Sequence, residues 1–343
     1  MTIRVFQVDP LPELEPWALE RERIERAGGE LVIGDCHSEA DVLSRAGDSE
    51  IFWVSWEPFM TREVMAALPN CRLVVRWGVG YDQIPVRAAT ELGVAVGNAP
   101  AYGTEDVAEH AIALILAASR HVAWFHCAIA AGGYPDSTSR SIHRMIGRTL
   151  GIVGVGRIGS AVARRGIGLG LRVIGFDPYR PAPELSALGV EPVAMDQLLA
   201  ESDFVSLHVP LNDETRGLMT RERLARMRPE AILVNTSRGP VVDEAALIEA
   251  LRSHTISGAA LDVFEREPLA TDSPLRTLDN VVLTPHAAGF SIEAWADLRA
   301  DMCNTAAEWI RDGWSARVVN PEVRARLRPR LATWSAGTGR NSP

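Results

Sequence analysis

Lysine is absent from this chain of 343 residues, and all 35 of its basic side chains are arginine. Without a side-chain amine the protein cannot form a Schiff base of its own, and it lacks the lysine of a Walker-type phosphate loop. The Tyr/Lys pair of short-chain dehydrogenases is excluded for the same reason. Genomic base composition is the simpler explanation of the absence, but the exclusions hold either way.

Cysteines are few, and long apolar segments are lacking. The four cysteines are far apart in the sequence and form no C-x-x-C or Cys/His metal pattern, so we expect no metal site and a reducing cytoplasm. They are Cys36, Cys71, Cys127 and Cys303. The chain starts without a charged leader and apolar core, and the apolar stretch Ala111–Ala118 is too short to span a bilayer. A net charge of −9 favours neither nucleic acid nor an anionic membrane as a partner.

The most informative motif is TLGIVGVGRIG at Thr149–Gly159, which has the G-x-G-x-x-G spacing after an apolar run and before a helix-like run. Gly154 allows a sharp turn, Gly156 leaves room for a pyrophosphate, and Gly159 lets the helix pack close to the strand. The free N–H groups and the dipole of the helix N-terminus favour negative charge there. The motif therefore predicts a dinucleotide-binding site in the middle of the chain.

A carboxylate in the expected place strengthens this prediction. The next strand-like run, Leu171–Phe176, is followed by Asp177, 18 residues after Gly159. A carboxylate there accepts hydrogen bonds from the ribose hydroxyls of NAD and repels a 2′-phosphate, so we expect NAD rather than NADP. Arg180, three residues later, could soften this preference.

Strand-like and helix-like runs alternate on both sides of the glycine motif, which predicts an α/β protein with two doubly wound parallel-sheet domains. The expected strands before the motif are Ile3–Val8, Leu31–Gly34, Ile51–Ser55 and Leu73–Arg76, and those after it are Arg172–Asp177, Asp203–His208, Ala231–Asn235, Ser257–Leu261 and Asn280–Leu283. Thr104–Trp124 is expected to be one helix, apolar on most faces and buried partly by a neighbour. A second long helix, Ile292–Ile310, is expected to return the chain to the first domain.

Three segments stand where strands are expected to end, and ligands bind at the carboxyl ends of strands in open α/β sheets. They are NTSRG (Asn235–Gly239), LDVFEREP (Leu261–Pro268) and TPHAAG (Thr284–Gly289). Together with GVGYDQI (Gly78–Ile84), NAPAYGTEDVAEHA (Asn98–Ala111) and HVPLNDETRGL (His208–Leu218), they resemble the D-isomer-specific 2-hydroxyacid dehydrogenases. The resemblance is strongest to the branch that includes phosphoglycerate dehydrogenase-like enzymes and C-terminal binding proteins.

The resemblance implies a flavodoxin-like substrate domain formed by residues 1–100 and 291–325, and a Rossmann NAD-binding domain formed by residues 101–290. Residues 326–343, rich in Arg, Gly, Ser and Pro, are expected to be a disordered tail. The implied protein is a cytoplasmic, homodimeric, NAD-dependent oxidoreductase that interconverts a small 2-keto acid and a D-2-hydroxy acid. The alternative is an NAD(H)-sensing interaction protein similar to C-terminal binding proteins, which keeps the site but acts by binding a partner.

The resemblance and the chemistry assign the same catalytic residues. Arg238 binds carboxylate and carbonyl oxygens as a planar fork, and His286 serves as acid or base because imidazole titrates near neutrality. Glu267 orients His286 and favours its charged form, whereas Glu265 is expected to face solvent. Taken singly, each residue is more often a surface ion pair, a structural histidine or a turn carboxylate; their joint spacing favours catalysis.

Further residues are assigned to substrate and cofactor. The backbone N–H groups of Val79 and Gly80 are expected to bind the substrate carboxylate. Trp56 and Trp77 either line the substrate pocket or belong to the core, as large tryptophans often do. The expected cofactor contacts are Gly154, Gly156, Arg157, Ile158, Gly159, Asp177, His208, Val209, Pro210, Thr215, Thr236, Asp262, His286 and Gly289. His110 and Glu109 are expected to serve structure or to line the cofactor cleft.

Overall fold

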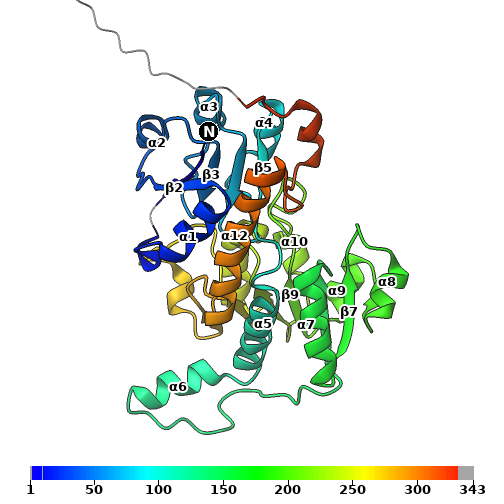
Figure 1. The fold of residues 1–343 in the computed structure, drawn as a ribbon. Coiled ribbons are helices and arrows are strands. Elements are labelled where there is room, and N and C mark those ends of the chain that lie inside the picture. The colour runs from blue at the N-terminus through cyan, green and yellow to red at the C-terminus, as the bar shows by residue number, and fades with distance from the viewer. Residues whose placement is uncertain (1, 10, 331–343) are drawn as a thin grey trace, which may run out of the picture. The chain divides into compact units, whose positions relative to one another are not determined.

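A computed structural model describes residues 2–9 and 11–330, which form two compact units (Figure 1). The first unit contains the described residues up to 102 and from 292 onward, and the second contains residues 103–291. Each unit is built on one parallel sheet with helices between its strands. The predicted α/β class with two doubly wound sheets is confirmed.

The sheet of the first unit has five strands in the order β2-β1-β3-β4-β5. Its strands are β1 Ile3–Gln7, β2 Gly29–Ile33, β3 Ile51–Val54, β4 Leu73–Arg76 and β5 Ala95–Gly97. Its helices are η1 Pro12–Leu14, α1 Ala18–Arg26, α2 Glu39–Arg45, α3 Arg62–Ala67, α4 Val86–Glu91, α12 Ile292–Asp312 and η4 Pro321–Arg326. Strand β5 was not predicted, because two of its three residues are alanine and glycine, which are depleted in strands.

The sheet of the second unit has seven strands in the order β12-β11-β10-β9-β6-β7-β8. The strands are β6 Thr149–Val153, β7 Arg172–Phe176, β8 Glu191–Pro192, β9 Phe204–Leu207, β10 Ile232–Asn235, β11 Gly258–Leu261 and β12 Val281–Leu283. The helices are α5 Thr104–Ser119, α6 Val122–Ala130, α7 Arg157–Gly168, α8 Ala182–Ala187, α9 Met195–Glu201, α10 Arg221–Leu224, η2 Gly239–Val241, α11 Glu244–Arg252 and η3 Pro274–Thr277. The strand order reverses between β6 and β9, which is where open α/β sheets bind ligands.

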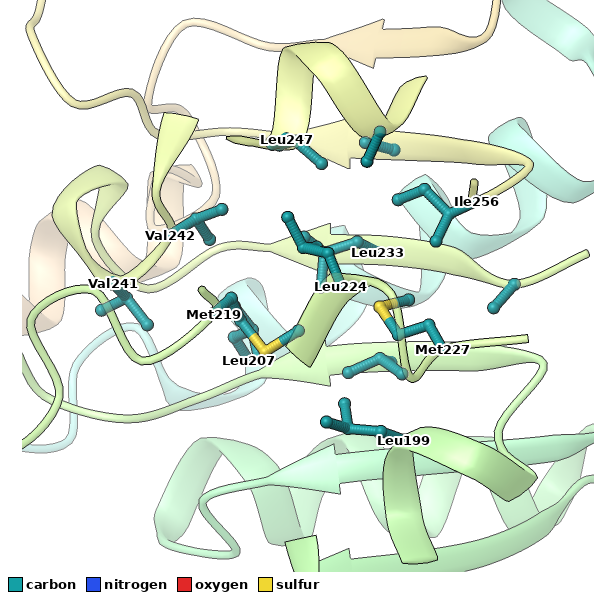
Figure 2. Close-up of a cluster of buried hydrophobic side chains, with 14 of the residues drawn as sticks. Leu199, Leu207, Met219, Leu224, Met227, Leu233, Val241, Val242, Leu247 and Ile256 are labelled. Carbon is teal, nitrogen blue, oxygen red and sulfur yellow. The ribbon is translucent and has the colours of Figure 1, made fainter. Parts of the chain in front are cut away.

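The core of the second unit explains why the sequences of its central strands are continuous apolar runs. All four residues of both β9 and β10 are buried, as expected for parallel strands covered on both faces. Figure 2 shows one of the two faces, where side chains of β9 and β10 pack against those of α9, α10 and α11. On the other face α5 packs against α7 (Figure 1). Burying one such aliphatic side chain stabilises the fold by about 1.5–3 kcal/mol.

The prediction of one helix over Thr104–Trp124 is wrong. The helix ends at Ser119, and α6 starts at Val122 after His121, whose backbone is left-handed with a φ of 53°. Helix α5 buries much of its apolar surface within its own unit, whereas all nine residues of α6 are described and none is buried. No single helix in the described ranges is long and apolar enough to cross a membrane; α5 and α6 meet that test only as a pair bent by 64°.

The predicted disordered tail is also partly wrong. Residues 326–330 are held in the first unit, because the Arg328 guanidinium donates hydrogen bonds to the carbonyl oxygens of Met65, Leu68, Cys71 and Leu92 at 2.7–3.2 Å. Several carbonyls near helix ends thus find a donor in one arginine. The remainder of the predicted tail, residues 331–343, lies outside the described residues.

Candidate active site

Three neighbouring strands bring the proposed catalytic side chains to one edge of the second sheet. Strand β11 pairs with β10 on one side and with β12 on the other. Arg238 follows β10, Glu267 follows β11 and His286 follows β12, each by a few residues. Because parallel strands end at the same edge, the three segments meet there, although 48 residues separate Arg238 from His286 in the sequence.

His286 and Glu267 are in direct contact. Nδ1 of His286 lies 2.6 Å from Oε2 of Glu267, and the other carboxylate oxygen accepts the backbone N–H of Phe264 at 3.0 Å. Both side chains are about one-third exposed. The carboxylate therefore orients the imidazole through Nδ1.

The charge of Glu267 is stabilised by its surroundings. Burial alone would raise its pKa, but the hydrogen bond and charge of His286, the N–H of Phe264 and the charge of Arg238 outweigh burial and hold the pKa below its usual range. Glu267 is consequently ionised at neutral pH. Glu265 is exposed, and its backbone N–H donates to the Glu244 carboxylate at 3.0 Å.

Close backbone packing places Arg238 beside this pair. A Cβ on Gly239 would lie 1.8 Å from both the carbonyl carbon and the oxygen of Phe264, so only glycine allows the loop after β10 to lie against the loop after β11. The side chain of Asn235 donates to the Arg238 carbonyl at 2.9 Å and accepts the N–H of Ser237 at 3.0 Å. These bonds hold the backbone that presents the half-buried Arg238 guanidinium.

The turn that carries His286 is unusual, because its φ is 55° in the left-handed region. A non-glycine residue in a sparsely populated region costs about 1–3 kcal/mol and persists only where its surroundings hold it. Asp262 holds the turn: it is fully buried, and its carboxylate accepts the backbone N–H groups of Ala287 and Ala288, each at 2.9 Å. The sequence also predicted a cofactor contact for Asp262, and this stays a prediction.

The glycine motif has the geometry that a bound dinucleotide needs. Gly154 has a φ of 89°, and a Cβ there would lie 2.6 Å from the His208 carbonyl oxygen. A Cβ on Gly159 would lie 2.1 Å from the Gly154 carbonyl oxygen, whereas one on Gly156 would meet no described atom within 4 Å. The motif thus packs tightly at its first and third glycines and leaves space at the second, at the start of α7.

Asp177 and Arg180 both bind the backbone of Val155 inside this loop, Asp177 through its N–H group and Arg180 through its carbonyl oxygen. Asp177 accepts the Val155 N–H at 2.9 Å. Arg180 donates to the Val155 carbonyl at 2.5 Å, to the Ser160 hydroxyl at 2.9 Å and to Glu184 at 3.1 Å. Because its guanidinium is engaged in these contacts, Arg180 is poorly placed to bind a 2′-phosphate.

Two buried polar atoms point to a ligand at the same edge. Nδ1 of His208, after β9, and Oγ1 of Thr236, after β10, have no hydrogen-bond partner within residues 2–9 and 11–330. Buried polar atoms are nearly always paired, so these two fit the predicted cofactor contacts. The other predicted contacts follow the strands: Arg157 and Ile158 begin α7, Val209, Pro210 and Thr215 follow β9, and Gly289 follows β12. The residues present therefore fit NAD.

In the first unit, Val79 and Gly80 lie in the loop after β4. The Asn98 side chain donates to the Val79 carbonyl at 2.7 Å, which ties this loop to the chain after β5. Trp56, after β3, is 44% exposed, and the Arg76 guanidinium lies 5.3 Å from the centre of its ring. Trp56 is therefore at the surface of its unit.

Trp77, unlike Trp56, is buried, and this decides between the pocket and the core for this side chain. It is 4% exposed, packs edge-on against Trp17 and Trp53, and donates its indole N–H to Gln7 at 2.9 Å. Its apolar ring belongs to the core of the first unit, so the assignment of Trp77 to substrate is wrong, because its ring and its one donor are already used. Trp53 is fully buried in the same core.

Sequence reasoning missed Asp9, which shapes the loop that carries Trp56. Its buried carboxylate accepts the backbone N–H groups of Ser55, Trp56 and Glu57 at 2.7, 2.5 and 3.1 Å. The only signal was an acidic residue directly after the first predicted strand. That signal does not say which loop the side chain reaches.

Comparisons with known proteins agree with this arrangement. Residues 112–288 match the family model described as D-isomer specific 2-hydroxyacid dehydrogenase, NAD binding domain. The glyoxylate reductase of Korarchaeum cryptofilum is 42% identical over 300 residues, which cover 87% of this chain and 86% of that relative. A D-3-phosphoglycerate dehydrogenase of Mycobacterium leprae is 44% identical over 289 residues, which cover 82% of this chain. The matched region is 54% of that relative, so this chain spans about half its length.

A solved structure shows the same two-unit fold. The glyoxylate reductase from Paecilomyes thermophila has a TM-score of 0.84 and 29% identity to this chain, and the match covers 94% of this chain and 99% of that one.

Proposed function

Because this chain belongs to the D-isomer specific 2-hydroxyacid dehydrogenase family and is an NAD-dependent enzyme of that family, we propose that it interconverts a small 2-keto acid and the corresponding D-2-hydroxy acid. NAD, when bound, supplies or accepts the hydride. The proposed roles of the protein are to bind the substrate carboxylate, to orient the keto group and to exchange one proton with its oxygen.

In this proposal Arg238 binds the carboxylate and the keto oxygen as a planar fork. His286 donates a proton from Nε2 to the keto oxygen during reduction and takes it back during oxidation. Glu267 keeps the ring oriented through its contact with Nδ1. The observation that carries the proposal is the 2.6 Å contact between Nδ1 of His286 and the ionised Glu267, beside which Arg238 places a second charge.

We further propose that the first unit is the substrate domain, where the N–H groups of Val79 and Gly80 bind carboxylate and Trp56 contacts the substrate. The loop after β4, held by Asn98, supports the first of these roles. The second unit contains the residues that match an NAD-binding domain, and the space at Gly156 supports a pyrophosphate there.

The experiment is NADH oxidation followed at 340 nm with glyoxylate, pyruvate, hydroxypyruvate and 3-phosphohydroxypyruvate. We expect reduction of at least one keto acid, and we expect His286→Ala to lose most of that activity, because the keto oxygen then lacks its proton donor. Glu267→Gln keeps the shape of the carboxylate but removes the charge that holds Nδ1 of His286, so kcat should fall by about tenfold or more. Glu265→Gln is the matched control and should leave kcat near the wild-type value.

Two results contradict this proposal. If His286→Ala retains wild-type reduction, the histidine is not the acid. If Glu265→Gln lowers kcat and Glu267→Gln does not, the pairing of the carboxylate with His286 has no role in proton transfer.

We also propose that the protein is a homodimer whose subunits meet through α6. Its sequence, VAWFHCAIA, is almost entirely apolar, and all nine residues are at least partly exposed. Val122 and Ile129 are 55% and 54% exposed, respectively. A second copy would remove this surface from water at about 25 cal/mol per Å².

A further inference from the structure

His110 has no part in the proposed mechanism, yet its imidazole reaches from α5 to the loop that carries His286. Its Nε2 lies 3.0 Å from the Thr284 hydroxyl and 3.4 Å from Oδ1 of Asp262. The side chain is 24% exposed, while Asp262 is fully buried. A helix on one face of the sheet is therefore linked by side chains to the turn at the sheet edge.

The direction of each hydrogen bond follows from the charge of Asp262. Burial raises its pKa, but hydrogen bonds from His110, Thr284, Ala287 and Ala288 outweigh burial and lower it to about 2. The ionised carboxylate can only accept, so the Thr284 hydroxyl donates to Oδ1, at 2.6 Å. The lone pairs of that hydroxyl then accept from Nε2–H of His110.

Asp262 in turn holds three successive backbone N–H groups of the turn. Its main-chain carbonyl accepts the N–H of His286 at 2.7 Å, and its carboxylate accepts those of Ala287 and Ala288 at 2.9 Å each. These bonds enclose the residue whose φ is 55°. The Asp262 carboxylate thus joins the turn on one side to Thr284 and His110 on the other.

We propose that His110 is a positioning residue for proton transfer, which acts through Thr284 and Asp262 to hold His286 in its left-handed conformation. The consequence for activity rests on the proposed function of His286, whereas the consequence for the turn does not. Misplacing a reacting group by about 1 Å can cost on the order of 100-fold in rate.

The first test compares His110→Leu with His110→Gln, which retains an amide donor near the position of Nε2. With glyoxylate as substrate, we expect His110→Leu to lower kcat at least tenfold, while KM and the Kd of NADH from fluorescence titration change less than threefold. His110→Gln should keep kcat within about threefold of the wild type. His37→Leu, which changes an exposed histidine of the first unit, is the matched control. A merely structural role would not lower kcat alone or respond to the glutamine.

The second test does not require activity. Amide hydrogen exchange of residues 285–289, measured by mass spectrometry, should become at least tenfold faster in His110→Leu and in Thr284→Val, but not in His110→Gln or Thr284→Ser. Thr284→Val keeps the shape of the side chain and removes its hydroxyl, so it tests the same link if His110→Leu does not fold.

Unchanged exchange in both His110→Leu and Thr284→Val overturns the proposal, as does an equal loss of kcat in His110→Leu and His110→Gln. If the wild type reduces no keto acid, the proposed function fails. Faster exchange would then still support the link from His110 to the turn.

Discussion

At the scale of single residues, Arg238 combines a positive charge with a planar group that no other cationic side chain has. Its guanidinium is planar and can bind two oxygens at once, and its charge contributes to the lowered pKa of Glu267. A lysine would preserve the charge but not the fork. The charge of the residue and its geometry can therefore be tested separately.

We expect Arg238→Lys to lower kcat/KM for the keto acid on the order of 100-fold, about 3 kcal/mol, with little change in NADH affinity. Steady-state kinetics and NADH fluorescence titration measure the two quantities. Arg266→Lys, at an exposed position of the segment that carries Glu267, is the control and should be near wild type. If Arg238→Lys turned over every accepted substrate normally, the substrate carboxylate would have to be bound by another residue.

The burial of His208 predicts how the stability of the folded protein depends on pH. Burial lowers the pKa of His208 from 6.5 to about 4, so the unfolded chain binds this proton more readily than the folded one. The stability that depends on the neutral ring is complete above pH 6.5 and is lost progressively as the pH falls from 6.5 to 4, by up to about 3 kcal/mol. Urea unfolding at pH 7, 5.5 and 4 should show this loss in the wild type and a shallower one in His208→Gln. Equal pH dependence in both proteins would refute the assignment.

At the scale of elements, the glycine loop and helix α7 after it contain two glycines at which a methyl group would meet open space. A Cβ on Gly156 has open space around it, as does one on Gly168 in the last turn of α7. Both positions therefore tolerate alanine in the fold, but only the first lies where the pyrophosphate is expected.

Gly156→Ala should fold normally and bind NADH at least tenfold more weakly, because the added methyl group occupies the space of the pyrophosphate. Gly168→Ala should bind NADH like the wild type and be more stable by about 0.5–1 kcal/mol, as expected for glycine to alanine in a helix. Isothermal titration and thermal unfolding separate the two effects. If Gly156→Ala bound NADH as tightly as the wild type, the prediction that the pyrophosphate lies at this loop would be wrong.

At the scale of the whole molecule, the exposed apolar surface of α6 predicts that the protein is a homodimer. The α6 helix and the segment after it extend from the rest of their unit (Figure 1). The aromatic side chain of Tyr134 in that segment is 93% exposed. Such a surface is unusual for a monomer and typical of an interface.

Sedimentation at micromolar concentration should give a dimer of this 37.3 kDa chain. Ile129→Glu, which places a charge on α6, should shift the protein to monomer, because burying an unpaired charge in an interface is costly. Leu43→Glu changes a side chain on α2 that is 44% exposed, and it should leave the dimer intact. A wild-type monomer under these conditions would contradict the proposal.

The sequence by itself determined that both sheets are parallel and covered by helices, because apolar runs such as Ile232–Asn235 are long enough to show that a strand is buried on both faces. It did not show the short strands β5 and β8. It also determined the place of the dinucleotide loop, since the special backbone of Gly154 and the close packing of Gly159 leave a mark on residue type. The order of the segments at the strand ends was sufficient to predict which side chains share one edge of the sheet. These features depend on local pattern and on the rules of parallel sheets.

Only the tertiary structure decided the rest, because it depends on contacts between residues far apart in the chain. The break before α6 needs one left-handed residue, His121, which an apolar helical pattern does not reveal. Trp77 is buried because Trp17 and Trp53 meet it in space. The link from His110 to the turn of His286 spans 176 positions of sequence. A hydrogen bond between such distant side chains is specified by the packing of a helix on a sheet, and no local pattern in the sequence encodes it.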